Sequence, residues 1–430
     1  MEKVPCILLF GAGKSATVLI QYLAKITFEK QWNFTVADLN LSNILSKTTT
    51  SAYLTAVELE IEDENARRTL IQTADVVISL LPPTLHFLVA KDCLMLRKHL
   101  LTASYLDEPI QSLAKEITDA GLLFLGEMGL DPGIDHMSAM QLIDEIHAKG
   151  GAISSFKSYC GGLIAPEFNT NPWQYKITWN PRNIVTAGKA GAIYKEQNQI
   201  VEKNYASIFK DCSSLQLDGV GELAYYPNRD SLSYIPIYGL ESAATFIRAT
   251  FRYPDFCKGW QKVVEAGFTS DEDLIDTHNT SYANMMERQL QQKEVLLQSN
   301  LLKYQFNWLG LRDHRLINKG IQPISAVFQQ LLENKWKLEP GDKDLVVMLH
   351  EIEFKLDGES QVAKTSLIVK GDDERSTAMA KTVGLPLGIA AILLLENKIT
   401  LRGLHIPIVK EIYHPVLEIL KQEGIKFRNF

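Results

Sequence analysis

The feature that most constrains the fold is a glycine-rich turn directly after a buried strand near the N-terminus. Val4 to Phe10 is a continuous apolar run, which is typical of a strand buried on both faces of a parallel sheet. The run ends in Gly11-Ala12-Gly13-Lys14-Ser15-Ala16, and apolar residues then recur at helical spacing from Val18 to Leu23. Between a strand and a helix, a G-x-G-x-x-A pattern lets a pyrophosphate approach the unpaired N–H groups of the helix N-terminus. The pattern therefore predicts a Rossmann-type dinucleotide site.

An acidic residue follows the next predicted strand. Phe34 to Ala37 has strand character, and Asp38 comes directly after it, about twenty residues beyond the glycines. A carboxylate at this position accepts hydrogen bonds from both hydroxyls of the adenosine ribose. The alternative is an ordinary turn residue at the end of a strand.

The first third of the chain continues as alternating strands and helices. Val76 to Leu81 predicts a strand that stops at Pro82-Pro83, followed by helix 84–95, strand 99–103, helix 107–120 and strand 122–126. This alternation is the doubly wound pattern, whose ligands bind beyond the carboxyl ends of the strands. Those ends are Leu80, Thr102 to Tyr105, and Glu127 to Asp131. Ser104 and Tyr105 have a second interpretation, as caps of the following helix.

The stretch from Glu127 to His136 lies where the alternation ends, and we expect it to be the hinge between two domains. Pro132 and Gly133 follow a predicted buried strand and end it. Clefts between domains are common ligand sites. The alternative is a plain interdomain turn, in which Asp131 starts the turn and Asp135 caps the next helix.

Composition narrows the class of partner. At 430 residues, with 46% hydrophobic and 22% charged residues, the chain predicts a globular protein of two or three domains. The net charge of −7 with no basic stripe argues against nucleic acid and anionic membranes, and favours a small molecule. Five widely spaced cysteines without ligand patterns predict free thiols and no metal site. No apolar run approaches the roughly 20 residues that span a bilayer, so we expect a cytoplasmic protein.

Beyond the hinge, three positions suggest substrate binding. Cys160 precedes Gly161-Gly162, a place for close backbone approach, although a buried Cys before a turn is the commoner use. Arg229 and Arg252 present rigid forks that match carboxylates, with surface arginine as the alternative.

Residues 253–343 are predicted to be nearly all helical. The predicted strands 345–354 and 366–369 and the apolar helix 377–395 follow.

With these residues in place, the chain resembles the L-glutamate-forming saccharopine dehydrogenases, the saccharopine reductase family. The resemblance covers eight ordered motifs, which are Gly11 to Ala16, Val77 to Pro82, Thr102 to Tyr105, Gly129 to His136, Ser158 to Leu163, Tyr226 to Ser231, Thr250 to Tyr253, and Ser376 to Pro386. It implies an α/β fold: a Rossmann-type doubly wound parallel sheet domain, a mixed α/β domain for substrate binding and dimerisation, and a small all-helical domain. We expect the Rossmann-type domain to comprise residues 1–131, with 396–430 returning to it. The mixed α/β domain should comprise residues 132–255 and 344–395, and the helical domain residues 256–343.

The family also implies site residues. By resemblance, the cofactor contacts Gly11, Ala12, Gly13, Lys14, Ser15, Ala16, Asp38, Leu39, Asn40, Leu59, Glu60, Leu80, Ala103, Ser104, Leu130, Asp131, Pro132, Gly133 and Trp179. The substrate saccharopine contacts Ser104, Tyr105, Asp131, Arg229, Thr250, Phe251 and Arg252. A homodimer is implied as well.

One departure bears on the cofactor. Fungal biosynthetic members of the family carry an arginine-containing segment after the second strand, whereas this chain has Asp38-Leu39-Asn40. Because a carboxylate repels a 2′-phosphate, the sequence favours NAD, with NADP as the alternative. The segment from Ala378 to Pro386 also resembles the lysine-degrading animal enzymes, which favours the degradative direction.

The chemistry implied by the resemblance is oxidation of saccharopine, with water, to glutamate and 2-aminoadipate 6-semialdehyde, a reversible reaction. The substrate amine must be held deprotonated to release hydride, and the predicted catalytic residues are Asp131, Tyr105 and Cys160. Two other functions stay open. One is a related imine-reducing dehydrogenase, such as a carboxynorspermidine or homospermidine synthase, and the other is a catalytically silent NAD-binding sensor.

Overall fold

The computed structural model describes residues 3–48 and 51–430, which divide into two compact units. Unit 1 comprises residues 1–151 and 367–428, and unit 2 comprises residues 152–366 and 429–430. The division keeps 132–151 and 367–395 with the N-terminal segment, whereas the sequence analysis assigned both stretches to the substrate-binding domain.

Unit 1 is built on a parallel sheet. Its strands within the described residues are β1 (Cys6–Phe10), β2 (Asn33–Asp38), β3 (Leu54–Glu58), β4 (Val76–Ser79), β5 (His99–Thr102), β6 (Leu123–Leu125) and β18 (Gly403–His405). They run in the order β18-β6-β5-β4-β1-β2-β3, and every neighbouring pair is parallel. All five residues of β1 are buried, because this central strand is covered on both faces. The order confirms the predicted Rossmann-type doubly wound sheet.

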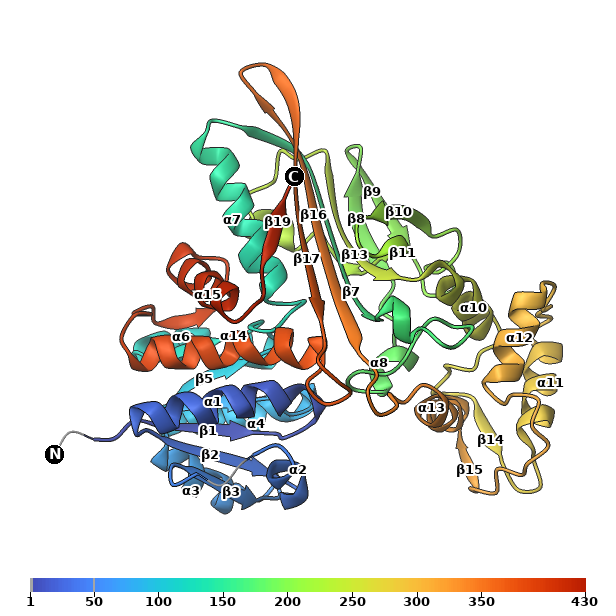
Figure 1. Ribbon diagram of the computed structural model, residues 1–430, viewed down its shortest axis with the longest axis horizontal. Coiled ribbons are helices and arrows are strands. Elements are labelled where there is room, and N and C mark those ends of the chain that lie inside the picture. Colours follow the sequence, from blue (N-terminus) through green and yellow to red (C-terminus); the bar gives the residue numbers. More distant parts are fainter. Residues whose placement is uncertain (1–2, 49–50) are drawn as a thin grey trace. The chain divides into compact units, whose positions relative to one another are not determined.

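The helices of unit 1 lie beside this sheet or, like α7 and α15, pack against other helices (Figure 1). They are η1 (Lys14–Ala16), α1 (Thr17–Lys30), α2 (Leu41–Leu45), α3 (Glu64–Thr73), η2 (Pro83–Leu85), α4 (His86–Met95), α5 (Glu108–Gln111), α6 (Ala114–Asp119), α7 (Ile134–Ala148), α14 (Ala378–Leu395) and α15 (Lys410–Gln422). The predicted single helix 107–120 is two short helices, α5 and α6. Side-chain caps start several of them: Asp63 accepts from Ala66 N at α3, and Thr377 accepts from Ala380 N at α14.

Helix α14 explains why the C-terminal part of the chain belongs to unit 1. It lies along α1 (Figure 1), and a Cβ added to Gly384 would stand 2.9 Å from Cβ of Leu19 and 3.3 Å from the carbonyl oxygen of Ser15. Glycine is therefore required for the close approach. Of the described helices, α14 alone is long and apolar enough to cross a membrane, and 83% of that stretch is buried inside the protein.

Unit 2 contains a mixed sheet with helices beside it. Its strands in the described chain are β7 (Ala152–Ile164), β8 (Ala192–Glu196), β9 (Gln199–Lys203), β10 (Ser213–Leu217), β11 (Gly221–Pro227), β12 (Arg229–Asp230), β13 (Thr245–Arg252), β16 (Asp344–Leu356), β17 (Glu359–Lys370) and β19 (Phe427–Asn429). Strand β7 pairs in parallel with β13 and antiparallel with β16. The short helices beside this sheet are η3 (Pro166–Phe168), α8 (Arg182–Val185) and α9 (Tyr234–Ile237).

The predicted helical segment also belongs to unit 2. Its helices are α10 (Pro254–Glu265), α11 (Tyr282–Gln292), α12 (Asn300–Trp308) and α13 (Ile324–Lys335). The sequence analysis missed an antiparallel pair inside this segment, β14 (Leu274–Asp276) with β15 (Ile321–Pro323). Trp173, Trp260 and Trp336 are fully buried at the centre of its core. None of the five cysteines forms a disulfide among the described residues.

Candidate functional sites

The glycine turn of unit 1 has the geometry that its sequence predicted. Gly11 has φ +95°, and a Cβ there would lie 2.8 Å from the carbonyl oxygen of Leu80, so only glycine fits. Gly13, by contrast, faces open space, with no described atom within 4 Å of a Cβ placed on it. Among the described side chains none caps the start of η1, which leaves its N–H groups available to an anion.

Asp38 lies beside this turn at the end of β2. Its Oδ2 accepts from the backbone N of Ala12 at 2.7 Å, and its Oδ1 accepts from Asn40 N at 2.9 Å and from Asn43 Nδ2 at 3.0 Å. Leu59 N donates to the carbonyl oxygen of Asp38, which brings Leu59 and Glu60 to the same place. The carboxylate is half-buried and tied to the glycine turn.

Two cations that the sequence analysis missed lie near this end of the site, Lys47 beside Asp38 and Arg375 beside Lys47. Lys47 Nζ donates to the carbonyl oxygen of Asn43 at 2.8 Å, and the guanidinium of Arg375 donates to the carbonyl oxygen of Ser46. Burial, together with the charge of Arg375, lowers the pKa of Lys47, while Asp38 acts in the opposite direction. The ribose end of the site therefore carries positive charge as well as a carboxylate.

A buried histidine links the ends of β4 and β5. His86 Nδ1 lies 2.8 Å from Oγ of Ser79, and its Nε2 lies 2.8 Å from Oγ of Ser104. Burial lowers the pKa of His86 to about 4, so the ring is neutral near pH 7. A neutral ring both donates and accepts, and it can fix the rotamer of Ser104. Sequence reasoning had no signal for His86, which lies within an unremarkable helical pattern.

The stretch that contains Asp131 lies against the end of β5. Met128 N donates to the carbonyl oxygen of Thr102, and Glu127 N donates to that of Ser104, both at 3.0 Å. Gly129 N closes a tight loop by donating to the carbonyl oxygen of Pro132. Asp131 lies half-buried in this loop. The structure thus brings together Ala103, Ser104 and Leu130 to Gly133, as the resemblance implied.

The other acidic and imidazole groups of this stretch form a buried network. His136 Nε2 lies 2.8 Å from Oε2 of Glu127, and both side chains are buried. Asp135 Oδ1 accepts from Gly133 N at 2.6 Å, so this carboxylate holds the start of α7 from within its first turn. These contacts give Asp135 a structural role at the start of α7.

Unit 2 gathers a second set of predicted residues on neighbouring strands. Cys160 on β7 pairs with Thr250 on β13, and Thr250 pairs with Tyr226 on β11. Residues paired across a sheet share a face, and so do residues two apart on one strand. Arg252 therefore lies on the same face as Thr250 and Cys160.

Arg252 occupies an unusual environment for a cation. Its guanidinium carbon lies 5.5 Å from the ring centre of Tyr175 and 5.7 Å from that of Phe256. Nη1 donates to the carbonyl oxygen of Phe251 at 2.7 Å, whereas Nε is buried with no hydrogen-bond partner. No ion pair joins Arg252 to a carboxylate among the described residues. Burial raises the pKa values of Tyr175 and Tyr226, so both phenols stay neutral. The guanidinium therefore lacks a counter-charge.

Three other residues were predicted to contact the substrate or the cofactor: Phe251, Arg229 and Trp179. The ring of Phe251 is fully buried and stacks on Tyr159 at 5.1 Å, on the face of the sheet opposite Arg252. Trp179 is 38% exposed. Arg229 is exposed on β12, which pairs with β8 rather than with β11 or β13.

The strand order, the glycine turn and Asp38 at the end of β2 define unit 1 as a dinucleotide-binding unit of the Rossmann class. The uncapped turn and the open space at Gly13 fit a pyrophosphate. No group of three or more His, Cys, Asp and Glu side chains that could hold a metal occurs among the residues that the structure describes.

The comparisons with known proteins place the chain within this class. The family model described as saccharopine dehydrogenase C-terminal domain matches residues 129–425, and that described as saccharopine dehydrogenase NADP binding domain matches residues 7–125. The chain belongs to the saccharopine dehydrogenase family, as its motifs indicated.

Individual relatives differ in length. Saccharopine dehydrogenase [NADP(+), L-glutamate-forming] of Schizosaccharomyces pombe is 30% identical, and the match covers 99% of each chain. The solved structure of apo histidine-tagged saccharopine dehydrogenase (L-Glu forming) from Saccharomyces cerevisiae has a TM-score of 0.88 and 30% identity, over 99% of this chain and 100% of that one. Alpha-aminoadipic semialdehyde synthase of Arabidopsis thaliana is 32% identical over 99% of this chain, which spans only 45% of that relative's length.

Proposed function

We propose that the protein catalyses the reversible, dinucleotide-dependent oxidation of saccharopine, with water, to glutamate and 2-aminoadipate 6-semialdehyde. The proposal combines the dinucleotide-binding geometry of unit 1 with an anion-binding residue in unit 2. It also agrees with the names of the S. pombe and S. cerevisiae relatives.

The observation that carries the proposal is Arg252. A half-buried arginine whose Nε is buried and unbonded, and which has no carboxylate partner among the described residues, is unfavourable unless a ligand completes it. Saccharopine has three carboxylates, and a carboxylate can accept two parallel hydrogen bonds from one guanidinium. Thr250 and Cys160 on the same face are then suited to contact the rest of the same substrate.

For the cofactor we propose NADP ahead of NAD, against the preference drawn from the sequence. The family model and the fungal relatives are named for NADP. Lys47 and Arg375 offer a physical reason, because Lys47 beside Asp38 and Arg375 beside Lys47 can offset the repulsion between Asp38 and a 2′-phosphate. When bound, the nicotinamide accepts the hydride that leaves the substrate.

The residues that resemblance assigned to catalysis keep their proposed roles. The carbon on the lysine side of the substrate amine gives up hydride, and the resulting C=N bond takes up water before it breaks into amine and aldehyde. Asp131, at its loop beside Ser104, is suited to hold the amine in its neutral, oriented form. Tyr105 and Cys160 are proposed to orient the amine or the water.

The two other functions receive less support. A dehydrogenase that takes polyamine cations needs acidic groups in its pocket, and the cation of Arg252 in an aromatic environment would repel such substrates. A silent sensor would have no need of a site for the substrate. A cytoplasmic homodimer and the degradative direction stay predictions.

The test is turnover by the purified chain. Saccharopine with NADP should produce reduced nicotinamide, followed by its absorbance, together with glutamate in equal amount. Equal efficiency with NAD would contradict only the cofactor preference. No turnover of saccharopine with either nucleotide, while both bind, would contradict the proposed function.

A further inference from the structure

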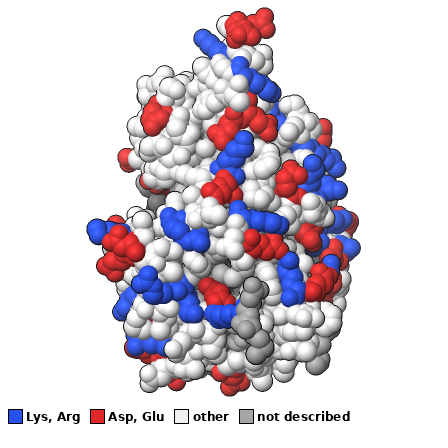
Figure 2. Space-filling view, turned by 90° about the vertical axis from the view of Figure 1, so that its left-hand side faces the viewer, with Lys and Arg blue, Asp and Glu red and all other residues white. Residues whose placement is uncertain are grey.

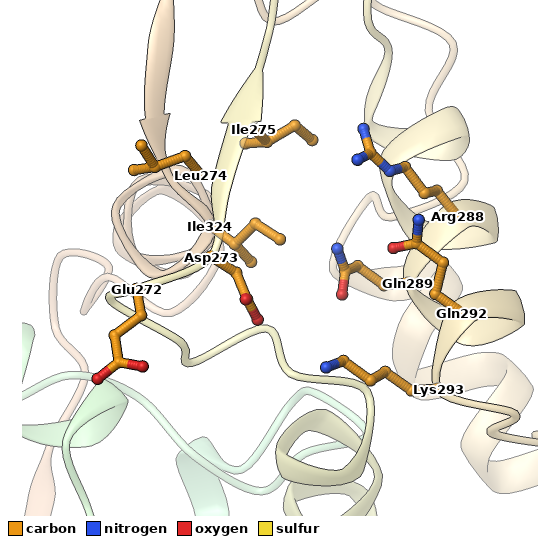
Figure 3. Close-up of a pocket in the computed structure, with 9 residues that line it drawn as sticks. All are labelled: Glu272, Asp273, Leu274, Ile275, Arg288, Gln289, Gln292, Lys293 and Ile324. Carbon is orange, nitrogen blue, oxygen red and sulfur yellow. The ribbon is translucent and has the colours of Figure 1, made fainter.

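A cavity of about 380 Å³ lies in the helical part of unit 2, and it shares no residue with the sites described above. Its walls are the segment Glu272 to Ile275, the last turn of α11 with Lys293, and Ile324 at the start of α13 (Figure 3). The volume falls in the range of small-molecule sites, about 300–1,000 Å³. Asp273 is fixed on one side of the cavity, because Ile324 N donates to its carbonyl oxygen at 2.9 Å.

Both hydrogen-bond acceptors and cationic side chains line this cavity. A Cβ placed on Gly267, which follows α10, would lie 3.4 Å from Cε of Lys293, 3.6 Å from Oε1 of Gln289 and 3.9 Å from Oδ2 of Asp273. In Figure 3, Gln289 and Asp273 point toward the open centre, while Arg288 and Lys293 lie at its two ends. Two hydrogen-bond acceptors therefore face one another, between two cations.

One acceptor is buried without a donor, and the other is an exposed carboxylate beside it. Gln289 is 4% exposed, and its Oε1 is buried without a donor. Within the described residues, no ion pair joins Asp273 to Lys293 or to Arg288. A buried acceptor beside a carboxylate favours a positively charged N–H donor, and the exposed cations of Arg288 and Lys293 are able to pair with an anion.

One small ligand satisfies both requirements. We propose that this cavity binds an α-amino acid in its zwitterionic form. Its ammonium donates to Gln289 Oε1 and Asp273, and its carboxylate pairs with Arg288 or Lys293. Ile275 and Ile324 supply apolar wall, which favours an aliphatic side chain. The site is independent of the proposed reaction, because none of these residues belongs to the substrate or dinucleotide sites.

L-Leucine is the probe for calorimetric titration of the full-length protein, without cofactor or saccharopine. 4-Methylpentanoate and 3-methylbutylamine have the same branched skeleton but carry only the carboxylate or only the ammonium. We expect saturable binding of leucine, with each analogue bound roughly tenfold or more weakly, the effect of losing about 1.4 kcal/mol. Binding of either analogue as tightly as leucine would overturn the zwitterion assignment.

Variants locate the site. Arg288→Ala and Lys293→Ala change exposed side chains, so the fold should survive, and their combination should abolish leucine binding. Lys303→Ala on α12 removes an exposed lysine that does not line the cavity, and it should bind leucine normally. Gln289→Leu should also lose binding if thermal unfolding shows an intact fold.

Two outcomes would overturn the proposal. One is no heat with millimolar leucine, as expected if Lys293 in solution turns to pair with Asp273 and fills the cavity. The other is leucine binding that the double variant leaves unchanged. Neither readout involves turnover of saccharopine, so either result leaves the proposed function standing.

Discussion

Replacing Arg252 by alanine tests whether its guanidinium is held ready for a substrate carboxylate. If it is, the substrate carboxylate in the variant loses its partner in a poorly solvated place, which weakens binding by about 2–5 kcal/mol. Each 1.36 kcal/mol corresponds to a factor of ten. The Michaelis constant for saccharopine should therefore rise roughly 30- to 5,000-fold, while NADP affinity stays constant.

The effect on folding should be small, since two contributions oppose each other. Arg252 loses its contacts with the rings of Tyr175 and Phe256, worth about 0.5–2 kcal/mol each. The variant also loses a buried Nε without a partner, whose desolvation opposes folding by about 1–3 kcal/mol. The free energy of unfolding should change by about 1 kcal/mol or less.

Steady-state kinetics with saccharopine, NADP titration and urea unfolding separate these outcomes. Arg252→Lys keeps the charge but not the fork and should fall between wild type and alanine. The control is Arg182→Ala, because Arg182 pairs with Asp271 and should not affect the Michaelis constant. An Arg252→Ala protein that is clearly destabilised and still binds saccharopine normally would show that the residue is structural.

Three further predictions concern unit 1. Asp131→Asn should lower turnover by a factor of roughly 10²–10⁴ with NADP binding intact. Asp135→Asn should mainly lower stability, measured by urea unfolding. The reverse pattern would show that the two roles have been exchanged. Arg375→Ala should weaken NADP binding by about tenfold, the worth of one charge-assisted contact, and leave NAD binding unchanged in fluorescence titrations; equal loss for both nucleotides would refute a 2′-phosphate contact. His86 has a folded pKa of about 4 against 6.5 as its ordinary value, so the unfolded chain takes up its proton first as the pH falls. The buried His86 should therefore lower the free energy of unfolding by about 2 kcal/mol at pH 5 relative to pH 7. In urea titrations, His86→Gln should lose less stability than the wild type between pH 7 and pH 5.

Local patterns in the sequence predicted the nucleotide-binding geometry well. The apolar run before Gly11 and the acid after the second strand are contiguous features whose meaning depends on only a few neighbours. The same holds for the loop of Asp131, because its position at a strand end is set by the strand itself. These elements follow from short-range geometry, and the structure shows each of them at the end of a strand. The stretch from Glu127 to His136 was wrongly expected to be an interdomain hinge, because the chain passes from unit 1 to unit 2 only after Gly151.

Features that depend on distant segments could not be predicted. Arg375 comes from the stretch before α14 and contacts Ser46, and no local pattern indicates its proximity to Lys47. His86 lies between two serines only because β4 and β5 are neighbours. The pair β14–β15 was missed because its three-residue strands lie within a pattern dominated by helical spacing.

Charge on the surface illustrates what composition can predict. On the face drawn in Figure 2, acidic and basic side chains are interspersed among uncharged ones. This mixture agrees with a small-molecule ligand, because association with a polyanion depends on clustered cations.

The return of the chain to unit 1 has a consequence for synthesis on the ribosome. Residues 1–151 emerge before residues 152–366, but α14, which covers Leu19, and β18, which pairs with β6, are made only after both stretches. Until then an apolar helix face and a strand edge are uncovered, and such surfaces promote aggregation. We therefore expect residues 152–366 to complete their fold before the nucleotide-binding unit does. A fragment that ends at Gly151 should not be a stable nucleotide-binding domain, however complete its glycine turn looks.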